Sequence, residues 1–436
     1  MTDYFEINGG NKLKGSVTIN GSKNAAVALI MGALINKGKT TLKNVPQIEE
    51  VYRLKEVMES IGVKFEAKEK ELTIIVPKKI AIEKINKVSA ERTRSIILMI
   101  GALAGRQKKY FIPQAGGCRL GSRTIKPHLF ALENLGIKIK AVRAGFEVDT
   151  RNLKSAKKIV QYESGDTVTE NILLAASQTK GKTIVHMASA NYQVQDLCFF
   201  LEKLGVKIKG IGTTTLEIEG KKNINKNIIY EISEDPIEAM FFLAVAIVTQ
   251  SQLKLQRCPI EFLELELLKL EKMGFKYKIL KEYLAKNAKT KLIDIETYPS
   301  KLIALEEKIY GRPFPGLNID NLPFFVPIVA FAKGKTLIHD WVFEDRAGYF
   351  VELNKLGMKI KLSDVHRVEV FGPSQLKGTE MVCPPALRPG AIILVAMLAA
   401  KGKSKLKEIY HIERGYKNLV ERLHKLGADI KRVKSS

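Results

Sequence analysis

Leu204-Gly-Val-Lys-Ile208 is one of six copies of a short pattern, in which a glycine ends an amphipathic segment and alternating apolar residues follow. The other copies are Ile61-Gly-Val-Lys-Phe65, Leu135-Gly-Ile-Lys-Ile139, Met273-Gly-Phe-Lys-Tyr277, Leu356-Gly-Met-Lys-Ile360 and Leu426-Gly-Ala-Asp-Ile430. The glycines, at positions 62, 136, 205, 274, 357 and 427, are 69 to 83 residues apart. Because a glycine just past a helix readily takes the left-handed conformation that closes the last turn, each copy predicts a helix end followed by a strand.

A second pattern keeps step with the first. Gly-Lys-Thr or Gly-Lys-Ser follows an apolar segment that predicts a buried helix, at residues 24–34, 171–177, 322–332 and 388–400. The turns themselves are Lys37-Gly-Lys-Thr40, Lys180-Gly-Lys-Thr183, Lys333-Gly-Lys-Thr336 and Lys401-Gly-Lys-Ser404. They lack the first glycine of a phosphate-binding P-loop and end helices instead of starting them. We interpret them as helix-to-strand turns and not as nucleotide sites.

Each repeat of about 70 residues therefore holds one very apolar helix, one amphipathic helix and several short strands. Such repeats can bury their apolar helices in the middle of a domain and place their sheets outside. Six repeats predict two α/β domains of three βαβ-type units each. The polar stretch Lys221-Lys-Asn-Ile-Asn-Lys-Asn227 looks like a linker, so we expect the seam there or just after it.

Composition limits the class of protein. The chain has 436 residues and is 45% hydrophobic, which excludes disorder throughout. Its longest apolar run, residues 390–400, is too short to span a membrane, and no signal peptide is visible. Four scattered cysteines suggest neither disulfides nor a zinc knuckle, so we expect a cytoplasmic protein. The net charge of +25 fits either an anionic partner or a general preference for lysine.

The most informative candidate site is Pro113-Gln-Ala-Gly-Gly-Cys118-Arg-Leu-Gly-Ser-Arg123. Its glycines permit a mobile loop and a close approach of the backbone to a ligand. Arginines beside a thiol lower its pKa and also bind phosphate or carboxylate. From the residues alone, a reactive thiol and an inert cysteine in a turn are equally favoured.

Other candidates are less specific. Lys23 and Asn24 lie at the predicted start of an apolar helix, where an ammonium and helix N–H groups attract an anion, although a solvated lysine explains the pattern too. Asp320 precedes another apolar helix, as an N-cap or as a general base. At comparable positions of the repeats, near predicted helix starts, lie Arg94, Arg346, Arg388 and Arg414, and for any one of them alone a surface salt bridge is the favoured explanation. The six histidines show no metal-ligand spacing, and neither G-x-S-x-G nor G-x-G-x-x-G occurs.

These segments together resemble the enolpyruvyl transferases, and among them the enzymes that act on UDP-N-acetylglucosamine in peptidoglycan synthesis. The similarity covers nearly the whole chain. Its most specific segments are the cysteine loop and Tyr410-His-Ile-Glu-Arg-Gly-Tyr416. It also includes Gly9-Gly-Asn-Lys-Leu-Lys-Gly15, Gly21-Ser-Lys-Asn-Ala-Ala26, Pro315-Gly-Leu-Asn-Ile-Asp320 and Val342-Phe-Glu-Asp-Arg346.

The resemblance implies two inside-out α/β domains of three repeated units each, with a cleft between them. Residues 22–232 would form the first domain, which carries the Cys118 loop. Residues 1–21 and 233–436 would form the second, which carries Asp320 and Arg414. The implied reaction moves the enolpyruvyl group of phosphoenolpyruvate to the 3-hydroxyl of UDP-N-acetylglucosamine and releases phosphate.

Residue roles follow from the same resemblance. Cys118 would protonate the methylene carbon of phosphoenolpyruvate, and Asp320 would lie near the proton removed from the sugar hydroxyl, which Asn24 also meets. The phosphate and carboxylate would be held by Lys23, Arg123 and Arg414, and further arginines of the cleft are matched by Arg94, Arg346 and Arg388. No metal or cofactor is required, because these cations supply the positive charge.

The chain also departs from the family pattern on the acceptor side. Ala386 replaces an aspartate of the family, and Lys126 reverses the charge of another. Further differences are Ser164-Gly-Asp-Thr167, which brings Asp166, then Ala190-Asn-Tyr-Gln193 and Asp235-Pro-Ile-Glu238. The reaction class is therefore better supported than the acceptor.

Two alternatives to this reading stay open. One is an enolpyruvyl transferase with another acceptor or weakened catalysis. The other is a basic, non-catalytic protein that binds nucleic acid, which is disfavoured because no stripe of stacking aromatics accompanies the basic residues. We expect a monomer without membrane insertion.

Overall fold

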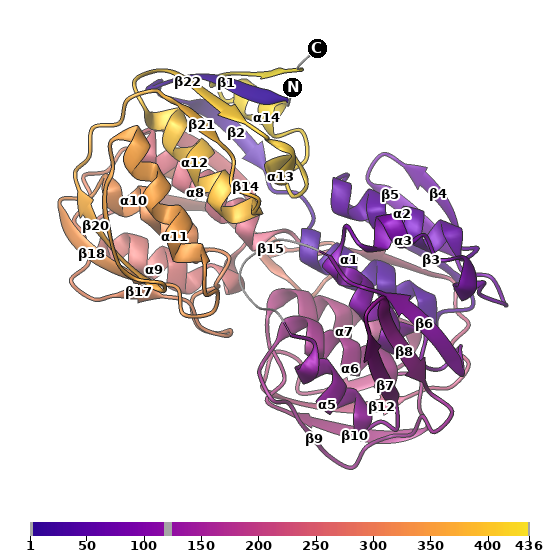
Figure 1. The fold of residues 1–436 in the computed structure, drawn as a ribbon. Coiled ribbons are helices and arrows are strands. Elements are labelled where there is room, and N and C mark those ends of the chain that lie inside the picture. Colours follow the sequence, from indigo (N-terminus) through magenta and orange to yellow (C-terminus); the bar gives the residue numbers. More distant parts are fainter. Residues whose placement is uncertain (1–2, 117–123, 435–436) are drawn as a thin grey trace. The chain divides into compact units, whose positions relative to one another are not determined.

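The computed structural model describes residues 3–116 and 124–434, and these divide into two compact units (Figure 1). The N-unit comprises residues 21–116 and 124–233, and the C-unit comprises residues 3–20 and 234–434. Three small sheets and a set of buried helices make up each unit. No described helix is long and apolar enough to cross a membrane.

The N-unit contains three sheets. The first has the order β13 (Ile228–Glu231), β3 (Lys39–Lys43), β5 (Glu71–Ile75), β4 (Lys64–Lys68). The second has the order β11 (Lys207–Lys209), β12 (Thr215–Gly220), β10 (Gly181–His186), β9 (Ile159–Val160). The third has only three strands, β6 (Lys109–Pro113), β8 (Gly145–Asp149) and β7 (Lys138–Val142).

The three sheets of the C-unit have four strands each. One has the order β15 (Lys276–Leu284), β16 (Lys291–Tyr298), β14 (Gln252–Pro259), β2 (Lys14–Thr18). Another has the order β17 (Ile309–Tyr310), β18 (Gly334–His339), β20 (Arg367–Gly372), β19 (Lys359–Asp364). The last has the order β21 (Glu380–Val382), β22 (Gly402–Lys407), β1 (Tyr4–Gly9), β23 (Asp429–Val433).

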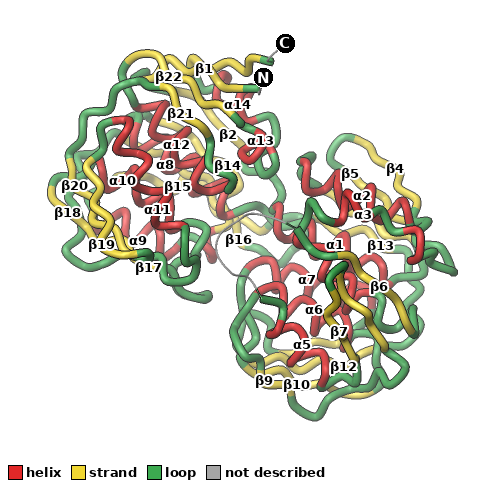
Figure 2. The backbone as a smooth tube through the Cα atoms, in the orientation of Figure 1, coloured by secondary structure: helices red, strands yellow, loops and turns green. Residues whose placement is uncertain are grey.

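Apolar helices fill the middle of each unit, and the strands lie toward its outside (Figure 2). The inner helices of the N-unit are α1 (Lys23–Gly32), α4 (Met99–Ala102) with the 3-10 turn η3 (Arg94–Leu98), and α6 (Asp166–Ala176). Those of the C-unit are α8 (Pro236–Val248), α10 (Phe325–Ala330) with η5 (Leu322–Phe324), and α12 (Leu387–Ala399). All thirteen residues of α8 are buried, since its apolar residues surround the whole helix. This inside-out α/β arrangement confirms the predicted fold class.

Amphipathic helices cover the inner ones. In the N-unit they are α2 (Glu49–Ser60), α3 (Lys87–Ala90), α5 (Lys126–Glu133) and α7 (Tyr192–Leu204). In the C-unit they are α9 (Glu264–Lys272), α11 (Arg346–Phe350) with η6 (Val351–Leu356), α13 (Tyr410–Glu413) and α14 (Leu419–Lys425). On α2, for example, the buried apolar residues Val51, Leu54, Val57 and Met58 follow the three-and-four spacing of one helix face.

Five of the six sheets share one plan. The strand that follows an inner helix pairs in parallel with an edge strand on one side and antiparallel on the other. β18, for example, pairs in parallel with β17 and antiparallel with β20. The sheet of β6, β8 and β7 is the exception, because β6 pairs only with β8.

Two edge strands are exchanged between the units. β2 directly precedes α1 of the N-unit but pairs with β14 of the C-unit, and β13 directly precedes α8 of the C-unit but pairs with β3 of the N-unit. The N-terminal strand β1 lies between β22 and β23, so it completes the sheet of the last repeat. The chain consequently passes between the units twice, at residues 20–21 and 233–234.

The glycine pattern is confirmed in all six copies. Gly62, Gly136, Gly205, Gly274, Gly357 and Gly427 have φ angles between 76° and 99°, in the left-handed region. Each Gly-Lys turn leads into a strand, namely β3, β10, β18 or β22, as predicted for helix-to-strand turns.

Two local expectations are wrong. The helix predicted for residues 171–177 begins earlier, at Asp166, because its first turn is polar and gives no apolar signal. The polar stretch from 221 to 227 is not a free linker. Asn36 Oδ1 accepts a hydrogen bond from the Lys226 amide (3.0 Å), and the Lys39 amide donates to Asn227 Oδ1 (2.9 Å). The stretch is thereby fixed to the start of β3 in the N-unit.

Candidate functional site

In the C-unit, one carboxylate contacts two arginines. Asp320 Oδ2 lies 3.2 Å from Arg388 Nη2, and Asp320 Oδ1 lies 3.6 Å from Arg346 Nη1. Both arginines are buried, whereas the Asp320 side chain is 27% exposed. The structure therefore brings together three of the predicted site residues, and the negative charge among them is the part that solvent or a ligand can reach.

Arg346 is held in place by its surroundings. Its Nε donates to Asp340 Oδ2 and its Nη2 donates to the Ile319 carbonyl (2.6 Å), while the guanidinium lies 4.3 Å from the centre of the Phe343 ring. Nη1 makes no hydrogen bond to any residue that the structure describes. Sequence reasoning missed Asp340, whose only signal is its place directly after β18.

Arg388 occupies the first turn of α12. Its Nη1 lies 3.1 Å from Tyr416 Oη, and burial raises the pKa of the Tyr416 phenol, so the ring stays neutral. Ala386, the N-cap of this helix, is buried and offers no side-chain hydrogen bond. Arg388 therefore pairs with Asp320 instead of a carboxylate at the cap.

Arg414 follows α13 in the same unit and is partly buried. Together with burial, its charge lowers the pKa of His411, so the imidazole is neutral at pH 7. The assignment of Arg414 to the substrate stays a prediction.

In the N-unit, Lys23 and Asn24 form the first turn of α1. Ser22 caps the helix by accepting from the Ala25 amide (3.2 Å), which fixes both side chains at the helix N-terminus. Asn24 Nδ2 lies 2.9 Å from the hydroxyl of Tyr192, the buried first residue of α7. The positive end of α1 and the Lys23 ammonium together suit an anion.

A buried carboxyl group lies in the field of Lys23. Burial, with a smaller effect of Asp166, raises the pKa of Glu170 to about 8, and a hydrogen bond from Gln193 and the charge of Lys23 act in the opposite direction. Gln193 Nε2 lies 2.8 Å from Glu170 Oε1. Glu170 was not predicted from the sequence, because a glutamate in the middle of an apolar helix gives no functional signal.

Arg94 begins η3 in the same unit, after the N-cap Thr93. Burial, followed by the charge of Arg94, lowers the pKa of His128 to about 3, so this histidine is neutral. Gly116 packs so closely on the backbone before Arg94 that a Cβ there would lie 1.6 Å from the Glu91 carbonyl oxygen. Cys118 and Arg123 themselves lie outside the described residues.

Two of the altered acceptor-side residues lie at helix starts of the N-unit. Lys126 begins α5 and is exposed. Asp166 begins α6 and accepts hydrogen bonds from Ser189 Oγ (2.5 Å) and Asn191 Nδ2 (2.9 Å). The change in the segment 190–193 and the appearance of Asp166 are thus structurally linked.

The altered segment 235–238 has structural roles. Asp235 caps α8 by accepting from the amides of Ile237 and Glu238, and Glu238 forms an ion pair with Arg422. Both residues are buried, so these contacts account for them within the C-unit.

The remaining thiols are unreactive by environment. Cys198, Cys258 and Cys383 are buried, and burial raises the pKa of each thiol, that of Cys383 to about 12. Among residues 3–116 and 124–434 no cluster of three His, Cys, Asp or Glu side chains is placed to hold a metal ion.

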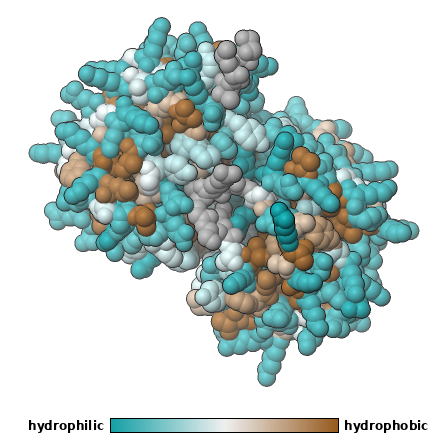
Figure 3. All heavy atoms as spheres, in the orientation of Figure 1, coloured by the Kyte–Doolittle hydropathy of each residue, from teal (hydrophilic) through white to brown (hydrophobic). Residues whose placement is uncertain are grey.

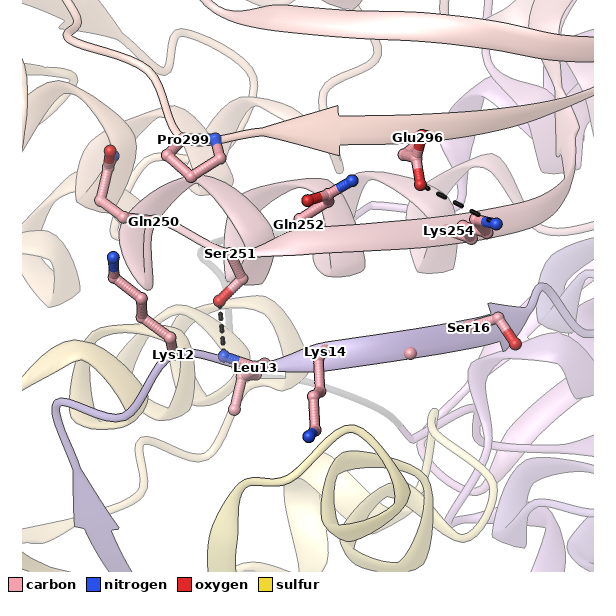
Figure 4. Close-up of a pocket in the computed structure, with 11 residues that line it drawn as sticks. Lys12, Leu13, Lys14, Ser16, Gln250, Ser251, Gln252, Lys254, Glu296 and Pro299 are labelled. Carbon is pink, nitrogen blue, oxygen red and sulfur yellow. Dashed lines mark hydrogen bonds and ion pairs between the residues drawn. The ribbon is translucent and has the colours of Figure 1, made fainter.

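Hydrophilic side chains cover much of the visible surface (Figure 3). One hollow of about 540 Å³ lies over β2 and β14 of the C-unit, and its lining includes Lys12, Lys14, Gln252 and the ion pair of Lys254 with Glu296 (Figure 4). None of the predicted site residues lines it. A hydrogen bond from the Leu13 amide to Ser251 Oγ (2.8 Å) and the ion pair of Lys254 with Glu296 account for its polar groups structurally.

Comparisons with known proteins agree with the family resemblance of the sequence. The family model of EPSP synthase (3-phosphoshikimate 1-carboxyvinyltransferase) matches residues 7–423. UDP-N-acetylglucosamine 1-carboxyvinyltransferase of Treponema denticola is 34% identical, over 99% of each chain. The enzyme of that name from Sulfurovum sp. is also 34% identical, over 98% of each chain.

Solved structures show the same fold. The enolpyruvyl transferase NikO from Streptomyces tendae matches with a TM-score of 0.85 at 23% identity, over 100% of both chains. An EPSP synthase from Acinetobacter baumannii matches with a TM-score of 0.76 at 19% identity, over 99% of this chain and 100% of that one. With six α/β repeats in two units and a family match over nearly its whole length, the chain belongs to the enolpyruvyl transferase family.

Proposed function

We propose that the chain transfers the enolpyruvyl group of phosphoenolpyruvate to the 3-hydroxyl of UDP-N-acetylglucosamine, with release of phosphate, at the start of peptidoglycan synthesis. The observation that carries the proposal is the full-length similarity, at about a third identity, to relatives named for this reaction. The contact of Asp320 with Arg388 supports it, because it presents a partly exposed carboxylate beside two buried arginines.

The reaction needs a proton donor, a proton acceptor and positive charge. In the proposed mechanism, the Cys118 thiol gives a proton to the methylene carbon of phosphoenolpyruvate, and the sugar hydroxyl oxygen attacks the adjacent carbon. Asp320 takes the hydroxyl proton. The tetrahedral intermediate then loses a methyl proton and inorganic phosphate, which restores the double bond.

The cations have separate roles in the proposal. Lys23, at the N-terminus of α1, together with Arg123 and Arg414, neutralises the phosphate and carboxylate of phosphoenolpyruvate. Arg94, Arg346 and Arg388 add positive charge, and the last two also orient Asp320. Asn24, fixed by Tyr192, donates to the acceptor hydroxyl. No metal ion enters these steps.

The test is phosphate release from the full chain with both substrates, with each alone, and with Cys118→Ser. We expect release only when both substrates are present and its loss in Cys118→Ser. Release that needs no nucleotide sugar would overturn the proposed acceptor, and unchanged release by the serine variant would remove the thiol from the mechanism.

A second candidate is enolpyruvyl transfer to a different acceptor. Two altered residues of the predicted acceptor side favour it. The Asp166 carboxylate is held by Ser189 and Asn191, and Lys126, which follows the Cys118 loop in the sequence, is exposed. Isothermal titration with UDP-N-acetylglucosamine separates the two candidates. Binding of UDP-N-acetylglucosamine in the micromolar range supports the first candidate. If this nucleotide sugar gives no heat of binding while phosphoenolpyruvate still binds, the second candidate is supported. A monomeric, cytoplasmic enzyme stays a prediction.

A further inference from the structure

The three-stranded sheet of the N-unit has a free edge where the other five sheets have a strand. In those five, the strand equivalent to β6 pairs in parallel with an edge strand that can be as short as two residues, as in β9 and β17. No such strand pairs with β6 among the described residues. An unpaired strand edge is a template on which another extended segment can add.

The segment that would supply this strand lies near β6 but does not pair with it as a strand. Residues 77–87 precede the inner helices of this repeat, but part of the segment forms the 3-10 turn η2 (Ile82–Lys84). It is attached to the start of β6 by side chains: Arg106 Nη2 donates to the Pro77 carbonyl (2.6 Å), and Gln107 Nε2 donates to the Ile80 carbonyl (3.0 Å). This spacing leaves a groove of about 600 Å³ between the segment and β6.

Backbone hydrogen-bonding groups of β6 point toward this groove. The Thr150 amide donates to the Lys108 carbonyl (2.9 Å), and the Gln114 amide donates to the Ala144 carbonyl (3.0 Å), so even-numbered residues of β6 face β8. Alternation along an antiparallel pair then turns the N–H and C=O groups of Lys109 and Phe111 to the free edge. Within the described chain, no backbone hydrogen bond joins either residue to the segment 77–87.

The charge of the groove selects the occupant. Its lining includes five cationic side chains and one carboxylate, namely Lys78, Lys79, Lys87, Arg106 and Lys109 with Glu83. Basic residues make up 71 of the 117 charged residues of the whole chain but five of the six in this lining, so the groove is more basic than the chain on average. Such a lining favours an anionic partner, and the free backbone groups favour an extended peptide over an ion.

We propose that this groove binds an extended, acidic peptide segment of a partner protein, which pairs with Lys109 and Phe111 of β6 as a fourth strand. Acidic side chains of the segment meet the lysines at the rim. Apolar side chains between them meet Ile82, Ile85 and the partly exposed Phe111. None of the predicted site residues lines the groove, so binding there does not use the catalytic machinery.

The test uses the full chain and a fluorescein-labelled heptapeptide of alternating glutamate and valine, followed by fluorescence anisotropy. We expect saturable binding that Lys79→Glu/Lys109→Glu weakens by about tenfold or more, with unchanged turnover. The matched control is Lys138→Glu/Lys140→Glu, which reverses two exposed lysines on β7, at the opposite edge of the same sheet. Equal weakening by both double variants would overturn the proposal in favour of general charge attraction.

Two peptides with methylated amides test the strand pairing itself. One carries N-methyl groups on its glutamates and the other on its valines, and only one of the two rows of amides can face β6. We expect one of them to lose binding, together with slowed hydrogen exchange of the Phe111 amide in the complex with the unmodified peptide. If both methylated peptides bind as well as the parent, the groove is not a strand-pairing site.

Two further results would show that the groove binds something other than an acidic peptide. An oligonucleotide of equal charge that binds as tightly as the peptide would make the groove a general polyanion site. A concentration-dependent dimer in sedimentation that Lys79→Glu/Lys109→Glu abolishes would make the occupant a second copy of this chain. A monomer at all concentrations supports the peptide.

Discussion

Asp320 and Arg388 are joined by an ion pair of 3.2 Å, between a carboxylate that is partly open to solvent and a buried guanidinium. The pair connects the loop before η5 to the first turn of α12. Since the N-cap of α12 is Ala386, Asp320 supplies the negative charge beside Arg388. Because Arg388 already contacts the carboxylate of Asp320, it has less need of a second carboxylate at the N-cap of α12, although such a group would still be favourable.

Substitution of Asp320 tests its role as the base. We expect Asp320→Asn to lower kcat by about 10² to 10⁴, because an amide cannot take the hydroxyl proton and no longer neutralises Arg388. Phosphate release under saturating substrates measures this. Asp345→Asn is the matched control, because Asp345 is exposed and makes no side-chain cap bond. A kcat near that of the unmodified chain would show that another group is the base.

Selective alkylation tests the thiol. Because the thiols of Cys198, Cys258 and Cys383 are buried and have raised pKa values, we expect iodoacetamide at pH 7.5 to modify the native chain once, at Cys118. Peptide mass spectrometry locates the label, and phosphoenolpyruvate should slow its attachment. Rapid modification of Cys383 in the folded chain would contradict the assignment.

The pKa of Glu170 predicts a pH-dependent stability. Folding raises this pKa from 4.5 to about 8, so between these values the folded state holds a proton that the unfolded state has lost. Glu170 therefore destabilises the fold increasingly as pH rises through that window. We expect Glu170→Gln to be more stable than the unmodified chain by a few kcal/mol at pH 8 and by little at pH 5. Urea unfolding at both pH values measures the gap, and a gap that is equal at pH 5 and pH 8 would refute the assignment.

The uncapped start of α12 predicts a stabilising substitution. The Arg388 amide is the first-turn N–H that a serine at the cap reaches, because Pro389 has none. We expect Ala386→Ser to raise the free energy of unfolding by about 0.5 to 1 kcal/mol. Urea denaturation checks this against Ala391→Ser, a buried position inside the same helix that should lose stability. A lower stability for Ala386→Ser would mean that the cap site has no room for the hydroxyl.

The repeats made the fold predictable from the sequence. Six glycines such as Gly205 and Gly357 marked helix ends, because a left-handed residue is a local requirement that glycine meets. The exchange of β2 and β13 was not visible in the residues themselves, since the pairing partner of an edge strand depends on contacts remote in sequence. Only the family resemblance indicated that the seam is passed twice.

Of the candidate site, too, some residues could be predicted from the sequence and others could not. Arg346 and Arg388 stood out because arginines near helix starts recur at comparable positions of the repeats. Asp340 and the buried Glu170 carried no pattern. Tyr192 and Tyr416 lie in segments that the family comparison singled out, but the contacts of their hydroxyls could not be predicted, because burial and pairing are set by tertiary contacts. The sequence also did not indicate that β6 lacks a parallel edge strand among the described residues, since the segment before it forms the 3-10 turn η2 (Ile82–Lys84).

The place of β1 determines when the protein can finish folding during its synthesis. β1 is the first of the described strands in the sequence, whereas the two strands that flank it, β22 and β23, are the last two. Until β22 and β23 have both been synthesised, β1 has an unpaired edge on either side, and an unpaired edge favours aggregation.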